Sequence, residues 1–247
     1  MKHSIVVFSL LFLMACSRPM TLTQVNYAER RMSDSLTASD AHLESVIRPY
    51  RDSMQAEMKQ VLVISDTVLT KSMPESDLGN LLAEILLDKT RQYTKRKVDI
   101  AVINFGGIRI NQLAKGNVTN ENAFELMPFD NKIVLLEIDG ATLQALFDKM
   151  ASTGGTPIAG ARYVIDNKKA TNISIQGKPL HTTIKYTVSI SDYLANGGDN
   201  LDVLKPIPQI STGVLLRDAF IEGFKDINAK GQHLKSVKDG RVSVVKN

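Results

Sequence analysis

Apolar and polar residues follow two different periods along most of the chain. Apolar residues that recur every three to four positions indicate helices, and short, nearly continuous apolar runs indicate buried strands. Helices are predicted at 40–60, 75–93, 119–127, 141–150 and 213–227. Strands are predicted at 61–69, 98–104, 132–138, 161–166, 171–176, 183–190 and 240–246. Because the two kinds of element interleave and several connections are too short for a crossover helix, we expect one α/β (α+β) domain with mixed sheets.

Local signals refine some of these boundaries. Asp40 and Thr119 stand where two of the helices would begin, and both are good N-cap residues. Pro49 lies inside the first helix and should kink or break it. The run 98–104, VDIAVIN, is apolar nearly throughout, so we expect it to be buried on both faces of a sheet. The stretch 203–209 is interrupted by prolines, and no element is predicted there.

The first 15 residues have the pattern of an export signal. Lys2 and His3 precede an apolar run that is too short to span a membrane, and the only cysteine of the sequence, Cys16, follows it. The tetrapeptide LMAC at 13–16 resembles a bacterial lipobox, so we expect Cys16 to be lipidated and to anchor the chain to a membrane surface. The residues after Cys16 contain no aspartate retention signal, which favours an outer membrane of the bacterial cell envelope.

The predicted organisation is therefore a lipoprotein signal peptide at 1–15, a lipidated cysteine with a flexible tether at 16–39, and one domain at 40–247. The composition agrees with a globular domain, since 43% of the residues are hydrophobic and 23% are charged. The 30 basic and 26 acidic residues are interspersed and there is no Trp. These features argue against nucleic acid as a partner.

Candidate catalytic groups are scarce. The four histidines are His3, His42, His181 and His233, and none has the H-x-H, D-x-H or H-E-x-x-H spacing of a metal centre. No G-x-S-x-G or S-x-x-K nucleophile motif is present either. We therefore predict no catalytic residue, no metal ligand and no cofactor in this chain.

Candidate ligand-binding groups follow predicted strands. Asn104, the pair Gly106 and Gly107, and Arg109 lie directly after the buried strand 98–104, at the carboxyl end where ligands of α/β sheets bind. The glycines permit positive φ and close backbone approach, and the guanidinium suits a carboxylate or a phosphate. Two aromatic residues in loops, Phe129 and Tyr193, could hold a planar ring. Gly198 and Asp199 follow the second aromatic residue, and a carboxylate can accept two vicinal hydroxyls.

These stretches together resemble a known family. The series ESDLGNLLAE at 75–84, NFGGIR at 104–109, MPFDN at 127–131, YTVSISDYLANGGDN at 186–200 and GVLLRDAFIEG at 213–223 is similar, in order and spacing, to the C-terminal, nucleotide-binding domain of 5′-nucleotidases. The resemblance covers about residues 40–247. It implies an α-β-β-α layered fold. It also implies that full-length relatives carry a separate N-terminal metallophosphoesterase domain with two metal ions.

The resemblance implies roles for the candidate residues. Phe129 and Tyr193 match the two aromatic residues that enclose the base, and Asp199 matches the carboxylate that binds the ribose hydroxyls. Asn104 matches a substrate-site asparagine, and Arg109 matches an arginine on the phosphate or ribose side. Pro74 stands where the family often has an arginine, which would weaken the grip on a phosphate.

Three functions remain open. The domain could be the nucleotide-recognition half of a split 5′-nucleotidase, with divalent metals only on a separate metallophosphoesterase chain. It could instead capture nucleosides or nucleotides at the envelope without a partner. Alternatively, it could be an interaction protein with a vestigial site.

Overall fold

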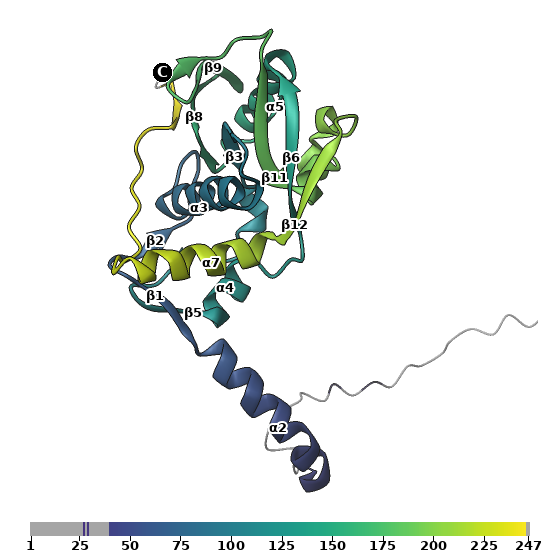
Figure 1. The fold of residues 1–247 in the computed structure, drawn as a ribbon, viewed down its shortest axis with the longest axis vertical. Coiled ribbons are helices and arrows are strands. Elements are labelled where there is room, and N and C mark those ends of the chain that lie inside the picture. The colour runs from purple at the N-terminus through teal and green to yellow at the C-terminus, as the bar shows by residue number, and fades with distance from the viewer. Residues whose placement is uncertain (1–26, 28, 30–39, 246–247) are drawn as a thin grey trace, which may run out of the picture. The chain divides into compact units, whose positions relative to one another are not determined.

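The computed structural model of the chain describes residues 27, 29 and 40–245. The predicted signal peptide, Cys16 and the predicted tether apart from Tyr27 and Glu29 lie outside the described residues. Internal contacts divide the chain into a unit that ends at Arg48 and a unit that begins at Pro49, and all the sheets belong to the second unit (Figure 1). Across the described positions we find no helix with the length and hydropathy needed to cross a bilayer.

Helix α2 (Ala41–Met58) opens the described part of the chain. The Asp40 carboxylate accepts the backbone N–H of His42 at 2.9 Å, which gives the helix the predicted N-terminal cap. The helix continues through Pro49, so the alternative of a break at this residue is wrong. Proline removes one N–H donor, and the remaining hydrogen bonds of an 18-residue helix are enough to carry it past the interruption.

The main sheet has the strand order β12-β6-β11-β3-β7. Strand β11 is parallel to β3, and the other neighbours are antiparallel, so the sheet is mixed as predicted. Its strands are β12 (Gln209–Leu215), β6 (Lys132–Asp139), β11 (Lys185–Ser191), β3 (Ile100–Val102) and β7 (Ile158–Ala159).

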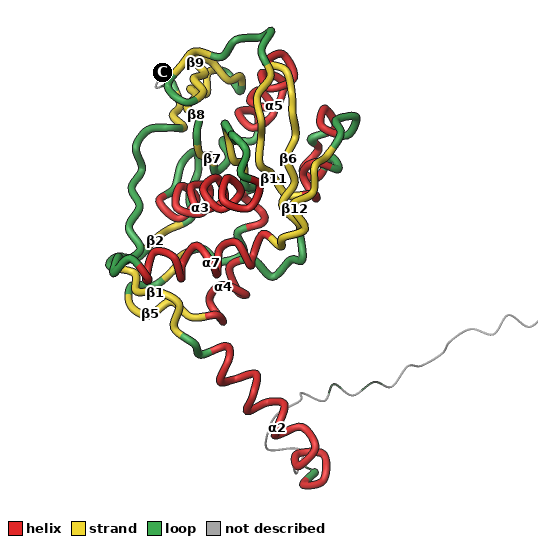
Figure 2. The backbone as a smooth tube through the Cα atoms, viewed as in Figure 1, coloured by secondary structure: helices red, strands yellow, loops and turns green. Residues whose placement is uncertain are grey.

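Both faces of the main sheet are buried. Ala101 and Ile103 belong to one apolar core with α3 (Asp77–Thr94) and α7 (Leu216–Ala229). Ile100 and Val102 belong to a second core with α5 (Gly140–Ser152) and strands β8 (Ala161–Asp166) and β9 (Lys169–Ile175). Successive residues of a strand point to opposite faces. The prediction that 98–104 is buried on both faces is therefore confirmed, and the layered arrangement of helices and sheets follows from it (Figure 2).

Smaller sheets complete the fold. The second core is closed by a four-stranded sheet in the order β10-β9-β8-β13, in which β13 is parallel to β8 and the other pairs are antiparallel. Two further antiparallel pairs, β1 with β5 and β2 with β4, lie beside the first core. The bounds are β1 Val61–Ser65, β2 Leu69–Thr70, β4 Gln112–Leu113, β5 Gly116–Thr119, β8 Ala161–Asp166, β9 Lys169–Ile175, β10 Lys178–Pro179 and β13 Val242–Val244.

Several local predictions can be compared with the structure. The Thr119 side chain accepts the backbone N–H of Asn122 and caps α4 (Asn120–Leu126) as expected. Strand β12 was not predicted, and α7 begins at Leu216 rather than at residue 213 because β12 occupies residues 209–215. A one-turn helix, α6 (Asp192–Ala195), begins within a stretch that we expected to be a loop.

The strand register brings distant parts of the sequence to one edge of the main sheet. Val188 of β11 lies opposite Ile100 of the parallel strand β3. Ser191, the last residue of β11, lies opposite Ile133 near the start of the antiparallel strand β6. The residues that follow β3, follow β11 and precede β6 therefore meet at the same edge.

The segment after α7 connects strand β1 to the four-stranded sheet. It runs along one side of the domain from α7 to β13, in yellow in Figure 1. Leu234 pairs with β1, where its N–H donates to the carbonyl of Ile64 at 2.8 Å. The chain then continues to β13, which pairs with β8 of the four-stranded sheet.

Candidate functional site

The turn after β3 has a compact geometry that requires glycine. Phe105–Gly107 forms a single 3-10 turn, in which the N–H of Gly107 donates to the carbonyl of Asn104 at 3.1 Å. A Cβ at Gly107 would lie 2.5 Å from Asn104 Oδ1. Neither Gly106 nor Gly107 has positive φ, so close approach to the buried Asn104 side chain, rather than backbone conformation, explains the second glycine.

Arg109 joins this turn to the loop that carries Phe129. Its backbone N–H donates to the carbonyl of Leu126 at 3.0 Å, and its Nη1 donates to the carbonyl of Gly106 at 3.4 Å. The guanidinium carbon lies 5.8 Å from the centre of the Phe129 ring, within the range of a cation–π contact. Arg109 is exposed and Phe129 is 39% exposed, so both remain accessible to a ligand.

A buried arginine of α7 holds the Phe129 loop. Arg217 donates from Nη1 to the carbonyls of Met127 and Phe129 at 3.3 and 3.4 Å, and from Nη2 to the Asp130 carboxylate at 2.8 Å. Its guanidinium also lies 4.2 Å from the centre of the Phe124 ring. Sequence reasoning placed this residue in a family-like motif but gave it no role. The structure shows that it fixes the backbone that presents Phe129.

Tyr193, Gly198 and Asp199 form one unit. The Tyr193 hydroxyl donates to Asp199 Oδ1 at 2.9 Å, and this hydrogen bond to a carboxylate raises the pKa of Tyr193. A Cβ at Gly198 would lie 2.5 Å from the Tyr193 ring, so glycine is needed for the ring to lie against the backbone. Asp199 and Asn200 both have positive φ, a conformation that short polar side chains tolerate. The turn thereby fixes the position of the carboxylate.

The Tyr193 unit is tied to the start of β6. Asp192 Oδ1 accepts the backbone N–H of Lys132 at 3.1 Å and that of Tyr193 at 2.8 Å. Among the described residues, no ring-to-ring contact joins Tyr193 to Phe129. The structure therefore places the two aromatic residues at the same edge of the sheet without stacking them on each other.

A cavity of about 390 Å³ opens at this edge. Asn104, Gly106 and Asp199 line it, together with apolar residues that include Met73 and Leu201. Three of the predicted ligand-binding residues, from two distant motifs, thus converge on one cavity. The other five predicted residues do not line the cavity. Gly107 and Gly198 are next in sequence to lining residues, Arg109 and Tyr193 hydrogen-bond to lining residues, and Phe129 contacts Arg109.

Lys71 is a residue of this site that sequence reasoning missed. It follows β2, and its Nζ donates to the carbonyl of Ile108 at 2.6 Å and lies 4.1 Å from the centre of the Phe105 ring. Burial, followed by the nearby charge of Arg109, lowers the pKa of Lys71. In the part of the chain that the structure describes, neither Lys71 nor Arg109 has a carboxylate partner. Two neighbouring cations without a counter-ion are typical of an anion-binding site.

A larger cavity of about 550 Å³ lies between α3 and α7 and contains none of the predicted residues. Its buried cation, Lys89, is already neutralised by Glu222 at 2.9 Å and Asp226 at 3.0 Å. Over the described residues, no group of three or more His, Cys, Asp or Glu side chains is arranged to hold a metal ion. The convergence of side chains at the sheet edge, rather than cavity size, therefore identifies the candidate site.

Comparisons with known proteins identify the family of the chain. The model of the family described as "5'-nucleotidase, C-terminal domain" matches residues 56–206. A 5′-nucleotidase of Vibrio parahaemolyticus is 25% identical over 196 residues, which are 74% of this chain and 33% of that protein. A cell wall protein of Listeria monocytogenes is 32% identical over 187 residues, 68% of this chain and 23% of that protein. The crystal structure of a 5′-nucleotidase precursor from Thermus thermophilus superposes with a TM-score of 0.72 at 26% identity, covering 83% of this chain and 43% of that one.

Proposed function

Since the chain belongs to the 5′-nucleotidase C-terminal domain family, we propose that it is the nucleotide- or nucleoside-binding component of a 5′-nucleotidase-type hydrolase system in nucleotide catabolism. The observation that carries the proposal is the convergence of Asn104, Gly106 and Asp199 on one cavity at the carboxyl edge of the main sheet. In this proposal Asp199 accepts the ribose hydroxyls, and Phe129 and Tyr193 offer ring faces to the base.

The charges at the site support an anionic end for the ligand. Lys71 and Arg109 are close enough for the charge of one to lower the pKa of the other. A phosphate placed between them would relieve this repulsion and accept charge-assisted hydrogen bonds. Lys71 thereby offers a cation near the loop in which Pro74 stands where the family often has an arginine.

We propose that a separate metallophosphoesterase chain supplies the chemistry. The chain spans less than half the length of the relatives that it matches, which leaves room in those proteins for a separate catalytic domain. The divalent metals and the activated water would lie on that partner. A lipid anchor at Cys16 on the bacterial cell envelope remains part of the proposal and would keep both components near the membrane surface.

Calorimetric titration of the chain with AMP and with adenosine tests the binding role. We expect saturable binding of both ligands, with tighter binding of AMP because Lys71 and Arg109 contact only its phosphate. Asp199→Asn should weaken both ligands, since it removes charge from the acceptor of the ribose hydroxyls. Absence of binding for both ligands would contradict the proposed function.

A mixing experiment tests the partner. A metallophosphoesterase domain prepared without its nucleotide-binding domain is assayed for phosphate release from AMP, alone and with increasing amounts of this chain. We expect the rate to rise and to saturate with the chain, and Asp199→Asn should reduce the gain. AMP binding without any gain in phosphate release would favour a stand-alone nucleotide-capture protein instead.

A further inference from the structure

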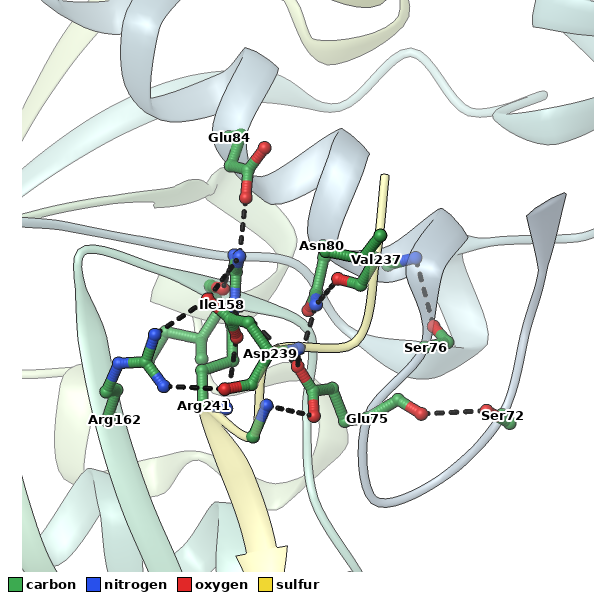
Figure 3. A network of polar contacts seen from close by, with 12 residues as sticks. Ser72, Glu75, Ser76, Asn80, Glu84, Ile158, Arg162, Val237, Asp239 and Arg241 are labelled. Carbon is green, nitrogen blue, oxygen red and sulfur yellow. Dashed lines mark hydrogen bonds and ion pairs between the residues drawn. The ribbon is translucent and has the colours of Figure 1, made fainter. Parts of the chain in front are cut away.

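Glu75 is a buried member of a polar network (Figure 3). Its side chain is only 7% exposed, and its carboxylate accepts three hydrogen bonds. Oε1 accepts the side-chain amide of Asn80 at 2.8 Å and the backbone N–H of Asp239 at 2.9 Å, and Oε2 accepts the backbone N–H of Gly240 at 3.0 Å. Glu75 therefore connects the start of α3 to the segment that precedes β13.

Further hydrogen bonds hold the same segment. Asn80 also donates to the carbonyl of Val237 at 2.9 Å. Arg241 donates to Asp239 at 2.9 Å, to Glu84 at 2.5 Å and to the carbonyl of Ile158 at 3.2 Å. Residues 237–241 lie beyond the part of the chain that the family model matches, so this clamp is a feature of the present fold rather than of the matched motif alone. We call residues 237–241 the C-terminal clamp.

The loop that the C-terminal clamp holds is the loop that carries Lys71. The Ser72 hydroxyl donates to the carbonyl of Glu75 at 2.7 Å, and the backbone N–H of Thr70 donates to the Asp77 carboxylate at 2.6 Å. The backbone N–H of Lys71 donates to the carbonyl of Asn111 at 2.8 Å. The first two bonds lie within the loop 70–77, so a shift of Glu75 would be transmitted to Lys71 through a short, internally bonded segment.

We propose that Glu75 and the C-terminal clamp are positioning elements that set Lys71 against Arg109 and thereby determine the preference for a phosphorylated ligand over a nucleoside. This inference rests on the proposed nucleotide-binding function. Glu75 touches no ligand in this proposal. It acts through the loop, whereas Lys71 makes the contact with the anion.

The test compares Glu75→Gln with two reference variants, Lys71→Ala and Glu222→Gln. In Glu75→Gln an amide donor faces at least one of the N–H groups that the carboxylate accepted, so the clamp loosens while side-chain volume is kept. Glu222→Gln disrupts a different network, with Lys89 and Tyr93, and serves as the control for a simple loss of stability. Affinities for AMP and adenosine are measured by calorimetry on the full chain.

We expect the dissociation constant for adenosine divided by that for AMP to fall about tenfold in Glu75→Gln. This ratio should approach the value for Lys71→Ala, and the affinity for adenosine itself should change little. Glu222→Gln should keep the wild-type ratio even if it lowers the melting temperature. A wild-type ratio in Glu75→Gln would overturn the inference and leave the proposed function intact.

Amide hydrogen exchange gives a readout that needs no ligand. The backbone N–H groups of Thr70 and Lys71 are both hydrogen-bonded, so they should exchange slowly in the wild type. We expect faster exchange at these two positions in Glu75→Gln but not in Glu222→Gln. Unchanged exchange at 70–71 in Glu75→Gln would overturn the inference even if the wild-type chain bound no AMP, and that absence of binding would separately contradict the proposed function.

Discussion

Two regions beside the start of α3 are rich in charged side chains. The charges are paired in one region and unpaired in the other. In the C-terminal clamp and its partners, the charges of four residues are paired: Arg241 contacts Asp239 and Glu84, and Arg162 contacts Asp239 at 2.7 Å. At the sheet edge, Lys71 and Arg109 repel each other, and neither has a carboxylate partner among the described residues. The loop 70–77 contributes a residue to each region, Lys71 to the sheet edge and Glu75 to the network of the C-terminal clamp.

This difference indicates what each region does. A charge that is paired and largely buried holds the fold together, because its removal leaves its partners unsatisfied. A charge that is left unpaired costs some stability and is available to a ligand. Removing a charge should therefore lower the free energy of unfolding in the first region and leave it nearly unchanged in the second.

The largest effect is expected from Arg241→Ala. The Arg241 side chain is only 11% exposed, and its loss leaves Glu75, Glu84 and Asp239 without their shared cation. Removing one partner of a buried ion pair costs about 3–5 kcal/mol of the free energy of unfolding. We expect a loss at the lower end of this range, because Glu84 is 47% exposed and Asp239 keeps its contact with Arg162. Urea denaturation measures the loss. Arg162→Ala is the control, since this side chain is 52% exposed and its removal should cost about 1 kcal/mol or less. Equal losses in the two variants would contradict the contrast.

Lys71→Ala should give the opposite result. We expect AMP affinity to fall by about 1.5–3 kcal/mol, the value of a hydrogen bond to a charged group, while adenosine affinity stays the same. The free energy of unfolding should change by less than about 1 kcal/mol, because the lost hydrogen bond to Ile108 is offset by relief of the repulsion from Arg109. Lys235→Ala, which removes an exposed lysine paired with Asp66, should change neither affinity. Strong destabilisation by Lys71→Ala would show that Lys71 is structural.

A third prediction concerns acid. Burial alone would raise the pKa of Asp239, but the hydrogen bonds and charge of Arg241, together with the charge of Arg162, lower it to about 2 from an ordinary value of 3.8. The depressed pKa means that Asp239 stabilises the fold above about pH 4 and loses this contribution as the pH falls toward 2. Asp239→Asn should lack this part of the acid dependence. Urea midpoints of both proteins between about pH 5 and pH 2 measure it, and parallel curves would contradict the prediction.

Much of the sheet edge could be predicted from the sequence because its residues lie at the ends of strongly patterned strands. The apolar run that contains β3 placed Asn104 and Arg109 at a carboxyl edge, and Thr119 marked the start of α4 through its local capping chemistry. Pairing of β11 with β3 and β6 then brought the motif at 104–109 together with Phe129 and Asp199. The positions of these residues at strand ends depend on local periodicity, which is visible in one sequence, whereas the pairing that brings the strand ends together comes from the structure.

Other features depend on partners that are far away in the sequence. Lys71 belongs to the site only because its Nζ reaches the carbonyl of Ile108, and nothing near residue 71 indicates this contact. Strand β12 is an edge strand with mostly exposed residues and a register shift, so it lacks the apolar alternation that marks a strand. The role of Arg217 depends on the carbonyls of Met127 and Phe129, which pattern analysis cannot locate.

The smallest effect is expected from Tyr193→Phe, which tests the proposed ribose-binding residues separately from the proposed phosphate-binding residues. Tyr193→Phe keeps the ring against Gly198 but removes the hydroxyl that orients Asp199. Because Asp199 is proposed to contact the ribose that AMP and adenosine share, both affinities should fall to a similar extent, by about 1 kcal/mol or less. Calorimetric titration with the two ligands measures the changes, and the Lys71→Ala variant, with its loss confined to AMP, provides the comparison. If Tyr193→Phe weakened only AMP binding, the phosphate rather than the ribose would lie beside Asp199. That result would contradict the assignment of Lys71 and Arg109 as the residues that bind the phosphate.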